Sequence, residues 1–198
     1  MTFSEQINDL FERAKWAEAR RLLEARLREQ PRNHWVLTRL GTTYYEEQDY
    51  ERALALTQRA QALAPTCPLV VWDLASTLEM LGKDRKALRL YQGLVARGTR
   101  AIANDECGEG IAWARSLLTD CLYSVAGCLH RLGRHQEALR SIQEYLQLRA
   151  MGVRSVYSLK EGRTRLQEIS GASRAEFIEH EIGASGKRLA KVVMGLVP

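Results

Sequence analysis

A spacing of 34 residues organises the first half of the chain. Pro31 and Pro65 are 34 residues apart, and Ala19, Ala53 and Ala87 follow one another at the same interval. A fixed period of this length is typical of a repeated supersecondary unit that stacks on copies of itself. Because a proline disfavours helix in the residue before it, we expect a helix to end at the same place in each repeat.

The composition indicates that the repeated unit is helical. About half of the 198 residues are Ala, Glu, Lys, Leu or Arg, the level at which helical repeats and coiled coils become the leading expectation. Only four residues are proline, whereas a β-sandwich or barrel of this length needs many more turn signals. With 45% hydrophobic residues the chain can bury a core, which excludes wholesale disorder.

Four units share one apolar pattern. The second unit begins at His34, the third at Pro68 and the fourth near Thr119, and the first unit is partial. Apolar residues at i, i+3, i+4 and i+7 form one buried stripe along the first helix of a unit. Gly82 and Gly133 are expected to end first helices, where a left-handed residue is needed.

The second unit resembles a tetratricopeptide repeat. It carries six of the family's signature residues, namely Leu40, Gly41, Tyr44, Ala53, Ala60 and Pro65. Leu37 stands where the family usually has tryptophan, and Thr57 stands at the aromatic place. The resemblance covers residues 1–98 and 117–150. It implies an all-α, right-handed superhelix of antiparallel helix pairs, with about four repeats and C-terminal capping helices.

The resemblance also implies that the first helices line a concave groove, into which certain exposed places of each repeat point. Those places supply the expected partner-binding residues, which are Asn8, Phe11, Trp35, Thr38, Thr42, Tyr45, Trp72, Ser76, Glu79, Tyr123, His130 and Arg131. Aromatic side chains with a polar tip are typical binding hot spots, and we expect a Trp72→Ala substitution to weaken partner binding. The alternative is that neighbouring helices or an insertion bury some of these aromatic rings.

The period fails once. From Ala87 to Ala138 the interval is 51 residues, 17 more than the repeat length, and the extra segment lies within residues 99–116. Residues 104–110 have the composition of a turn. From Ile111 to Leu132 only Gly127 disfavours helix, so we expect the first helix of the fourth unit to be longer by about two turns.

The insertion holds the densest group of reactive side chains, which are Asp105, Glu106, Cys107 and Glu109. Acidic residues ahead of a helix complement its dipole, which favours a capping and bracing role. Partner contact is the second interpretation, and a metal site or an enzyme that also uses His130 is the third. The chain contains neither a calcium-loop motif nor an H-E-x-x-H motif.

The four cysteines match no zinc motif. They are Cys67, Cys107, Cys121 and Cys128, and their spacing contains no C-x-x-C pair. We interpret them as small, buried apolar side chains in a reducing compartment.

After the fourth repeat, residues 151–198 are expected to form capping helices and a basic tail. One helix is predicted to begin at Val153, run towards Ile169 and end at Gly171. A second helix would present Phe177, Ile178 and Ile182, and the tail holds Lys187, Arg188 and Lys191.

These features predict a non-catalytic interaction module or scaffold that binds a peptide or helix in the groove without a cofactor or metal. The net charge of +5 is spread over both halves, which argues against nucleic-acid binding. The start of the chain has no signal pattern and no apolar run reaches a membrane span, so we expect a cytoplasmic protein. The main alternative is a homo-oligomeric assembly factor joined through the C-terminal helices.

Overall fold

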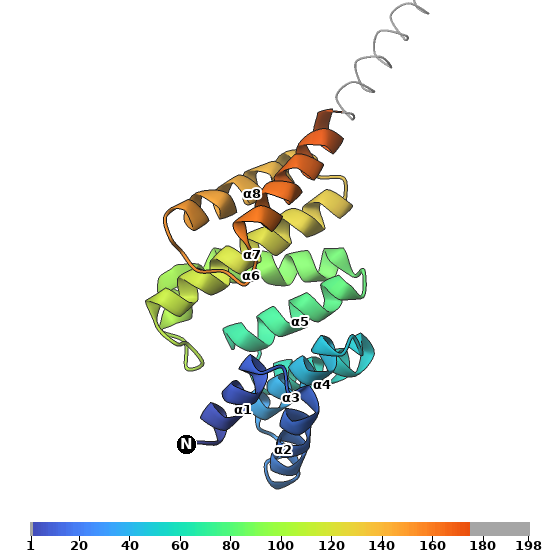
Figure 1. The fold of residues 1–198 in the computed structure, drawn as a ribbon, viewed down its shortest axis with the longest axis vertical. Coiled ribbons are helices and arrows are strands. Elements are labelled where there is room, and N and C mark those ends of the chain that lie inside the picture. The colour runs from blue at the N-terminus through green and yellow to red at the C-terminus, as the bar shows by residue number, and fades with distance from the viewer. Residues whose placement is uncertain (1, 175–198) are drawn as a thin grey trace, which may run out of the picture.

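The protein is a stack of helices that ascend in chain order (Figure 1). The structure, a computed structural model, describes residues 2–174. Its helices are α1 (Phe3–Glu12), α2 (Trp16–Glu29), α3 (His34–Glu46), α4 (Tyr50–Leu63), α5 (Pro68–Met80), α6 (Asp84–Ala103), α7 (Ile111–Arg131) and α8 (His135–Ala150). A further helix begins at residue 159 and continues to residue 174. Residues 2–174 contain no strand, and the all-α prediction is confirmed.

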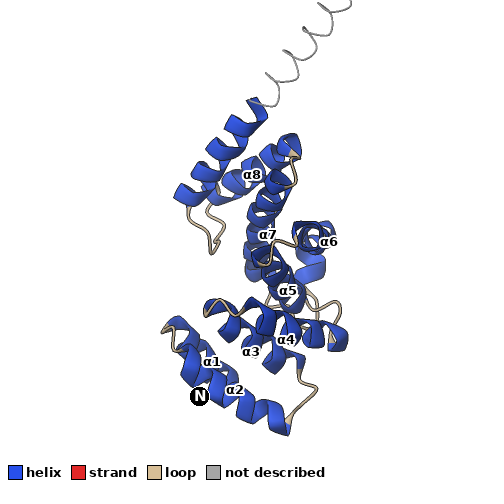
Figure 2. Ribbon diagram, turned by 90° about the vertical axis from the view of Figure 1, so that its right-hand side faces the viewer, coloured by secondary structure: helices blue, strands red, loops and turns tan. Residues whose placement is uncertain are grey.

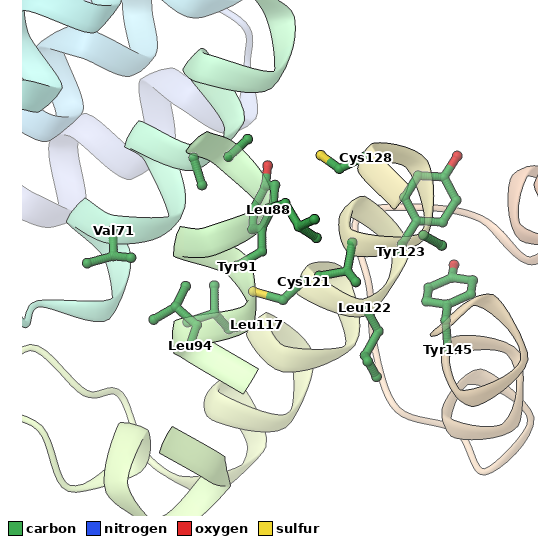
Figure 3. Packing of buried hydrophobic residues seen from close by; sticks show 14 of the residues in the cluster. Val71, Leu88, Tyr91, Leu94, Leu117, Cys121, Leu122, Tyr123, Cys128 and Tyr145 are labelled. Carbon is green, nitrogen blue, oxygen red and sulfur yellow. The ribbon is translucent and has the colours of Figure 1, made fainter. Parts of the chain in front are cut away.

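Neighbouring helices pack in sequence, and the first helices of successive pairs also touch (Figure 2). Helix α3 contacts α5, and α5 contacts α7, so these helices form one side of the stack. The largest buried cluster runs from α4 through α8 to the helix over residues 159–174. Figure 3 shows Tyr91 and Leu94 packing near Leu117 and Cys121 in this cluster. Burial therefore continues from repeat to repeat.

The same turn joins the two helices of every pair. The residue at its left-handed position is Ala14, Gln48, Gly82 or Gly133, with φ of 52°, 64°, 67° and 74° respectively. The next backbone N–H then donates to the carbonyl five residues earlier, as Lys83 does to Leu78 at 2.8 Å. This bond satisfies a free carbonyl at the helix end. The prediction for Gly82 and Gly133 is confirmed, and the first two repeats use the turn without glycine.

Side-chain caps and prolines fix several helix ends. Thr2 and Glu5 form a reciprocal capping box at the start of α1. Asn33 accepts a hydrogen bond from the backbone N–H of Val36 at the start of α3. Helices α2 and α4 end two residues before Pro31 and Pro65, in agreement with the predicted helix ends.

The extra residues between the third and fourth repeats lengthen helices on both sides of a loop. Helix α6 bends at Gly98, where φ is 73° and ψ is 165°, and then continues to Ala103. Helix α7 begins at Ile111, where the sequence predicted the longer helix to begin. The loop over residues 104–110 joins them. The continuation of α6 beyond Gly98 was not predicted.

The helix after the fourth repeat begins later and runs further than predicted. Residues 153–158 are not helical, because Ser158 and Glu161 form a capping box that starts the helix after Ser158. Gly171 lies inside this helix and does not end it. The predicted helix around Phe177 and the basic tail lie outside the described residues. Within residues 2–174, no helix is both long enough and apolar enough to cross a membrane.

Candidate functional site

A small hollow lies between α3 and α5, on the side of the stack formed by the first helices. Its volume is about 60 Å³. The residues that line it are Gly41, Thr42, Tyr45, Glu46, Thr57, Trp72, Asp73, Ser76 and Thr77. Four of the residues predicted to bind a partner are in this set, namely Thr42, Tyr45, Trp72 and Ser76. The second and third repeats therefore bring predicted groove residues together around one concave space.

Trp72 supplies an unused hydrogen-bond donor to this region. Its ring is half-buried, and its indole Nε1–H is buried but finds no acceptor among residues 2–174. A buried donor without an acceptor costs about 1–3 kcal/mol, which is regained when an acceptor arrives. The side chain therefore combines a partly exposed apolar surface with a buried donor, which a bound group reaches only when the ring or its cover moves.

Asp73 places a carboxylate next to Trp72 in sequence and in the same hollow. It is 9% exposed and accepts a hydrogen bond from the Thr42 hydroxyl at 3.0 Å. Burial raises the pKa of Asp73 to about 6, and the nearby Arg39 and Thr42 oppose the shift. Asp73 was not predicted as a site residue, because it is not at one of the places of the repeat that were expected to face the groove.

Tyr45 forms the other aromatic wall of the hollow. Its ring packs edge-on against Tyr50, with 5.4 Å between the ring centroids. Burial raises the pKa of its phenol well above the usual range. The hydroxyl is therefore neutral at physiological pH and can both donate and accept a hydrogen bond.

A second aromatic group lies towards the N-terminal end of the stack. The Arg39 guanidinium lies over the rings of Phe11 and Trp35, 5.6 Å from each centroid. Its Nε is buried and has no acceptor within residues 2–174. Phe11 and Trp35 are half-buried, and Asn8 on α1 is exposed. Arg39 was not among the predicted site residues. The sequence feature that could have indicated it is a basic residue between the aromatic groove positions of the same repeat.

Some predicted groove residues hold helices together instead of facing solvent. Thr38 is 0% exposed and donates to the carbonyl of His34 in its own helix. The Tyr91 hydroxyl lies 3.0 Å from both the Ser76 Oγ and the Glu79 Oε2 atoms, and it donates its one proton to either of them. The Tyr91 contacts join α5 to α6. Thr38, Ser76 and Glu79 therefore all have hydrogen-bond partners within the fold.

In the fourth repeat, residues 153–174 cover the face that was expected to be open. Tyr123 stacks on Tyr157 with 3.9 Å between ring centroids, and the Arg165 guanidinium lies 3.7 Å from the Tyr123 centroid. Arg165 also donates to the Tyr123 carbonyl, and Asp120 accepts from the backbone N–H of Val156. Tyr123 is 7% exposed as a result. The structure therefore places Tyr123 in the core (Figure 3).

Comparison with known proteins agrees with the repeat geometry. Residues 10–78 match the model of a tetratricopeptide-repeat family. This part of the chain, from the end of α1 into α5, therefore consists of tetratricopeptide repeats. A search of curated proteins found no match.

Solved tetratricopeptide-repeat structures share the fold at low sequence identity. MamA is 16% identical, with 89% of this chain and 97% of MamA covered and a TM-score of 0.55. A tetratricopeptide repeat protein from Parabacteroides merdae is 19% identical, with 96% and 72% covered and a TM-score of 0.59. YrrB, described as a TPR protein with an unusual peptide-binding site, is 17% identical, with 92% and 88% covered and a TM-score of 0.53. Proteins with tetratricopeptide repeats are generally interaction modules and typically non-catalytic.

The remaining predicted residues of the fourth tetratricopeptide repeat lie at the end of α7. His130 and His135 approach each other, with 3.1 Å between their Nδ1 atoms. Burial and the neighbouring His135 lower the pKa of His130. Arg131 pairs with Glu79 at 2.7 Å and with Asp84 at 2.8 Å, which links this repeat to the preceding one.

The insertion candidates do not form one acidic site. Asp105 pairs with Arg97 at 2.6 Å, whereas Glu106 and Glu109 are exposed. Gly110 is the N-cap of α7, and no side chain caps that helix, so the predicted capping role is wrong. Of these four residues, Asp105 alone has the predicted bracing role, through its pair with Arg97. Cys107 instead lies beside His34.

Proposed function

We propose that this protein is a binding module that receives an extended peptide or a helix on the side of the stack formed by α1, α3 and α5. The observation that carries the proposal is the unsatisfied Trp72 indole N–H beside the hollow lined by Thr42 and Tyr45. A peptide supplies both a backbone carbonyl for this donor and an apolar side chain for the hollow. Peptide-binding sites commonly combine a preformed apolar pocket with a few placed polar groups.

Two features support this location over the rest of the stack, and a third supports peptide binding by this fold in general. The Arg39 group extends the aromatic surface towards α1, which gives a bound segment a continuous path over three helices. The fourth repeat offers less surface, because residues 153–174 already occupy its inner face. The structurally similar YrrB carries a peptide-binding site on the same fold.

Peptide selection from a random display library tests the proposal. The intact chain is expected to select peptides whose affinity falls about 3–10-fold in a Trp72→Phe variant, because phenylalanine keeps the apolar ring and loses about 1 kcal/mol of hydrogen bonding. Trp113→Phe is the matched control, since Trp113 packs against the core from α7, away from the hollow. The proposed location would be refuted if the selected peptides bound the Trp72→Phe and Trp113→Phe variants equally well. It would also be refuted if only Trp113→Phe weakened their binding.

A further inference from the structure

Three segments that are distant in sequence bring metal-binding side chains to one point. His34 is the first residue of α3, Cys67 precedes the first residue of α5, and Cys107 lies in the loop over residues 104–110. The His34 Nε2 atom is 3.3 Å from the Cys107 Sγ atom. The imidazole nitrogen and the two sulfur atoms all lie within 4.8 Å of one another. The sequence spacing of these residues gave no sign of this convergence.

The loop that carries Cys107 is fixed by contacts to the segment that carries Cys67. The backbone N–H of Cys107 donates to Asp105 at 3.0 Å, and Asp105 pairs with Arg97. Arg97 in turn donates to the carbonyl of Thr66, the residue before Cys67. Such outer hydrogen bonds orient the first-shell ligands of metal sites.

The surroundings favour sulfur and imidazole ligands over a hard, oxygen-bound cation. Cys67 is buried in an apolar cluster with Leu37 and Val70, and Cys107 packs against this cluster. Cys67 and Cys107 are free thiols and are not joined by a disulfide.

We propose that His34, Cys67 and Cys107 bind one zinc ion. Thiolate and imidazole are the ligands that zinc prefers, and in a tetrahedral site ligand atoms at the usual zinc–sulfur distance of 2.3 Å lie about 3.8 Å apart. The His34–Cys107 pair at 3.3 Å must therefore open slightly, whereas the wider pairs, which lie within 4.8 Å, must close by up to about 1 Å. Binding releases the two thiol protons to solvent. The fourth position is left to a water molecule or to a ligand from another molecule.

Zinc here would clamp the insertion to the second and third repeats. The ion joins the start of α3, the start of α5 and the loop between α6 and α7, so one bond network links two repeats and the insertion. This role is independent of peptide binding in the hollow, whose lining includes none of the three ligands.

The test is metal titration of the reduced, full-length chain. Calorimetry with Zn²⁺ is expected to give one site per chain, and Co²⁺ is expected to give the ultraviolet sulfur-to-metal band and the visible bands of a tetrahedral thiolate site. Cys67→Ala, Cys107→Ala and His34→Asn should each weaken Zn²⁺ binding at least about tenfold. Cys121→Ala and Cys128→Ala are matched controls, because both thiols are buried outside the cluster.

Two results would overturn the zinc site. One is the absence of heat and of cobalt–sulfur absorption from a reduced chain whose circular dichroism shows that it is folded. The other is binding that survives Cys67→Ala and Cys107→Ala but is lost with His130→Asn or His135→Asn, which would assign the ion to the histidine pair at the end of α7. Ca²⁺ and Mg²⁺ are expected to give no heat, because the three ligands offer no oxygen.

Discussion

At the scale of single residues, the turn of each repeat shows what a periodic sequence does and does not disclose. The period places Ala14 and Gln48 at the positions that Gly82 occupies in the third repeat. All three have positive φ, although only the glycine indicates this conformation from the sequence. Tertiary packing of the helix pair holds alanine and glutamine in a conformation that they rarely adopt alone.

This turn gives the first prediction. Gln48→Gly is expected to raise the free energy of unfolding by about 0.5–1 kcal/mol, because glycine adopts φ of 64° without the Cβ clash. Gly82→Ala is the converse change and should lower it by about 1 kcal/mol. Urea denaturation followed by circular dichroism measures both. A destabilised Gln48→Gly variant would show that the side chain contributes more than its backbone conformation costs.

Asp73 gives the second prediction, a pH dependence of stability. Its pKa is about 6 in the folded chain and 3.8 for the ordinary side chain, so the folded state holds the proton more tightly. The free energy of unfolding therefore falls as pH rises from about 4 to about 6, by roughly 1–3 kcal/mol, and then stays level. Asp73→Asn should reduce this slope, as measured by denaturation at several pH values.

Asp120 provides the internal comparison for this pH profile. Burial also raises its pKa to about 6, so Asp120→Asn is expected to remove another part of the same slope. An Asp73→Asn variant whose stability varies with pH as steeply as that of the natural chain would contradict the assignment.

The residue scale also marks the limit of sequence-based site prediction. Trp72 and Tyr123 occupy the same kind of place in their repeats, and the repeat pattern predicts both as groove residues. The structure leaves Trp72 beside a hollow and puts Tyr123 under Tyr157 and Arg165. The position of a residue within its repeat can be found from that repeat alone. Its exposure also depends on which later segment of the chain packs over it.

At the scale of helices and loops, the insertion is mostly helical and its loop packs closely. A Cβ added at Gly108 would lie 2.5 Å from the carbonyl oxygen of Ile102 and 2.6 Å from that of Ala103. The loop can therefore return over the end of α6 only with glycine at this position. The sequence predicted where α7 begins, because a long segment without helix breakers follows Gly110. It did not predict the bend at Gly98, where the backbone takes a φ of 73°.

Gly108→Ala is the third prediction. The clash is expected to displace the loop and lower the free energy of unfolding by about 1–3 kcal/mol. Gly93→Ala is the matched control, because Gly93 lies inside α6 with no atom within 4 Å of an added Cβ. That substitution should stabilise the chain by about 0.5–1 kcal/mol through helix propensity. Equal thermal stability of the two variants would argue against the close packing of the loop.

The segment after α8 is the second element whose place was only partly predictable. Its helix start could have been found from Ser158 and Glu161, which have the spacing of a capping box. Its docking on α7 could not, since it depends on contacts of Tyr157 and Arg165 with a helix more than thirty residues earlier. The sequence therefore predicted capping helices without showing which surface they cover.

Tyr157→Ala is the fourth prediction. Loss of the stack on Tyr123 and of the hydroxyl contact with Ser124 is expected to cost about 2–4 kcal/mol of stability. Val156→Ala, one residue away and 71% exposed, should change stability by less than about 0.5 kcal/mol. Hydrogen exchange of the residue 159–174 amides should also accelerate in Tyr157→Ala. Unchanged exchange there would mean that Tyr157 does not hold the helix in place.

At the scale of the whole molecule, the repeats bury three successive hydrophobic clusters, and residues 2–174 leave the inner side of α1, α3 and α5 uncovered. The fold follows from the 34-residue period and the helical composition, both of which are local properties of the sequence. The position of the uncovered region cannot be predicted from local sequence, because it depends on the segment after α8 packing against the fourth repeat. What remains is the surface from Phe11 and Arg39 to Trp72, and the proposed function rests on that surface.

The indole N–H of Trp72 is the most direct probe of this account. The chain has four tryptophans, so a ¹⁵N-labelled sample gives four indole N–H signals, which single Trp→Phe variants assign. On addition of a selected peptide, the Trp72 signal is expected to move downfield as its N–H gains an acceptor, while the Trp113 signal stays in place. Peptide binding that leaves the Trp72 signal unmoved and shifts that of Trp113 would contradict the proposed groove.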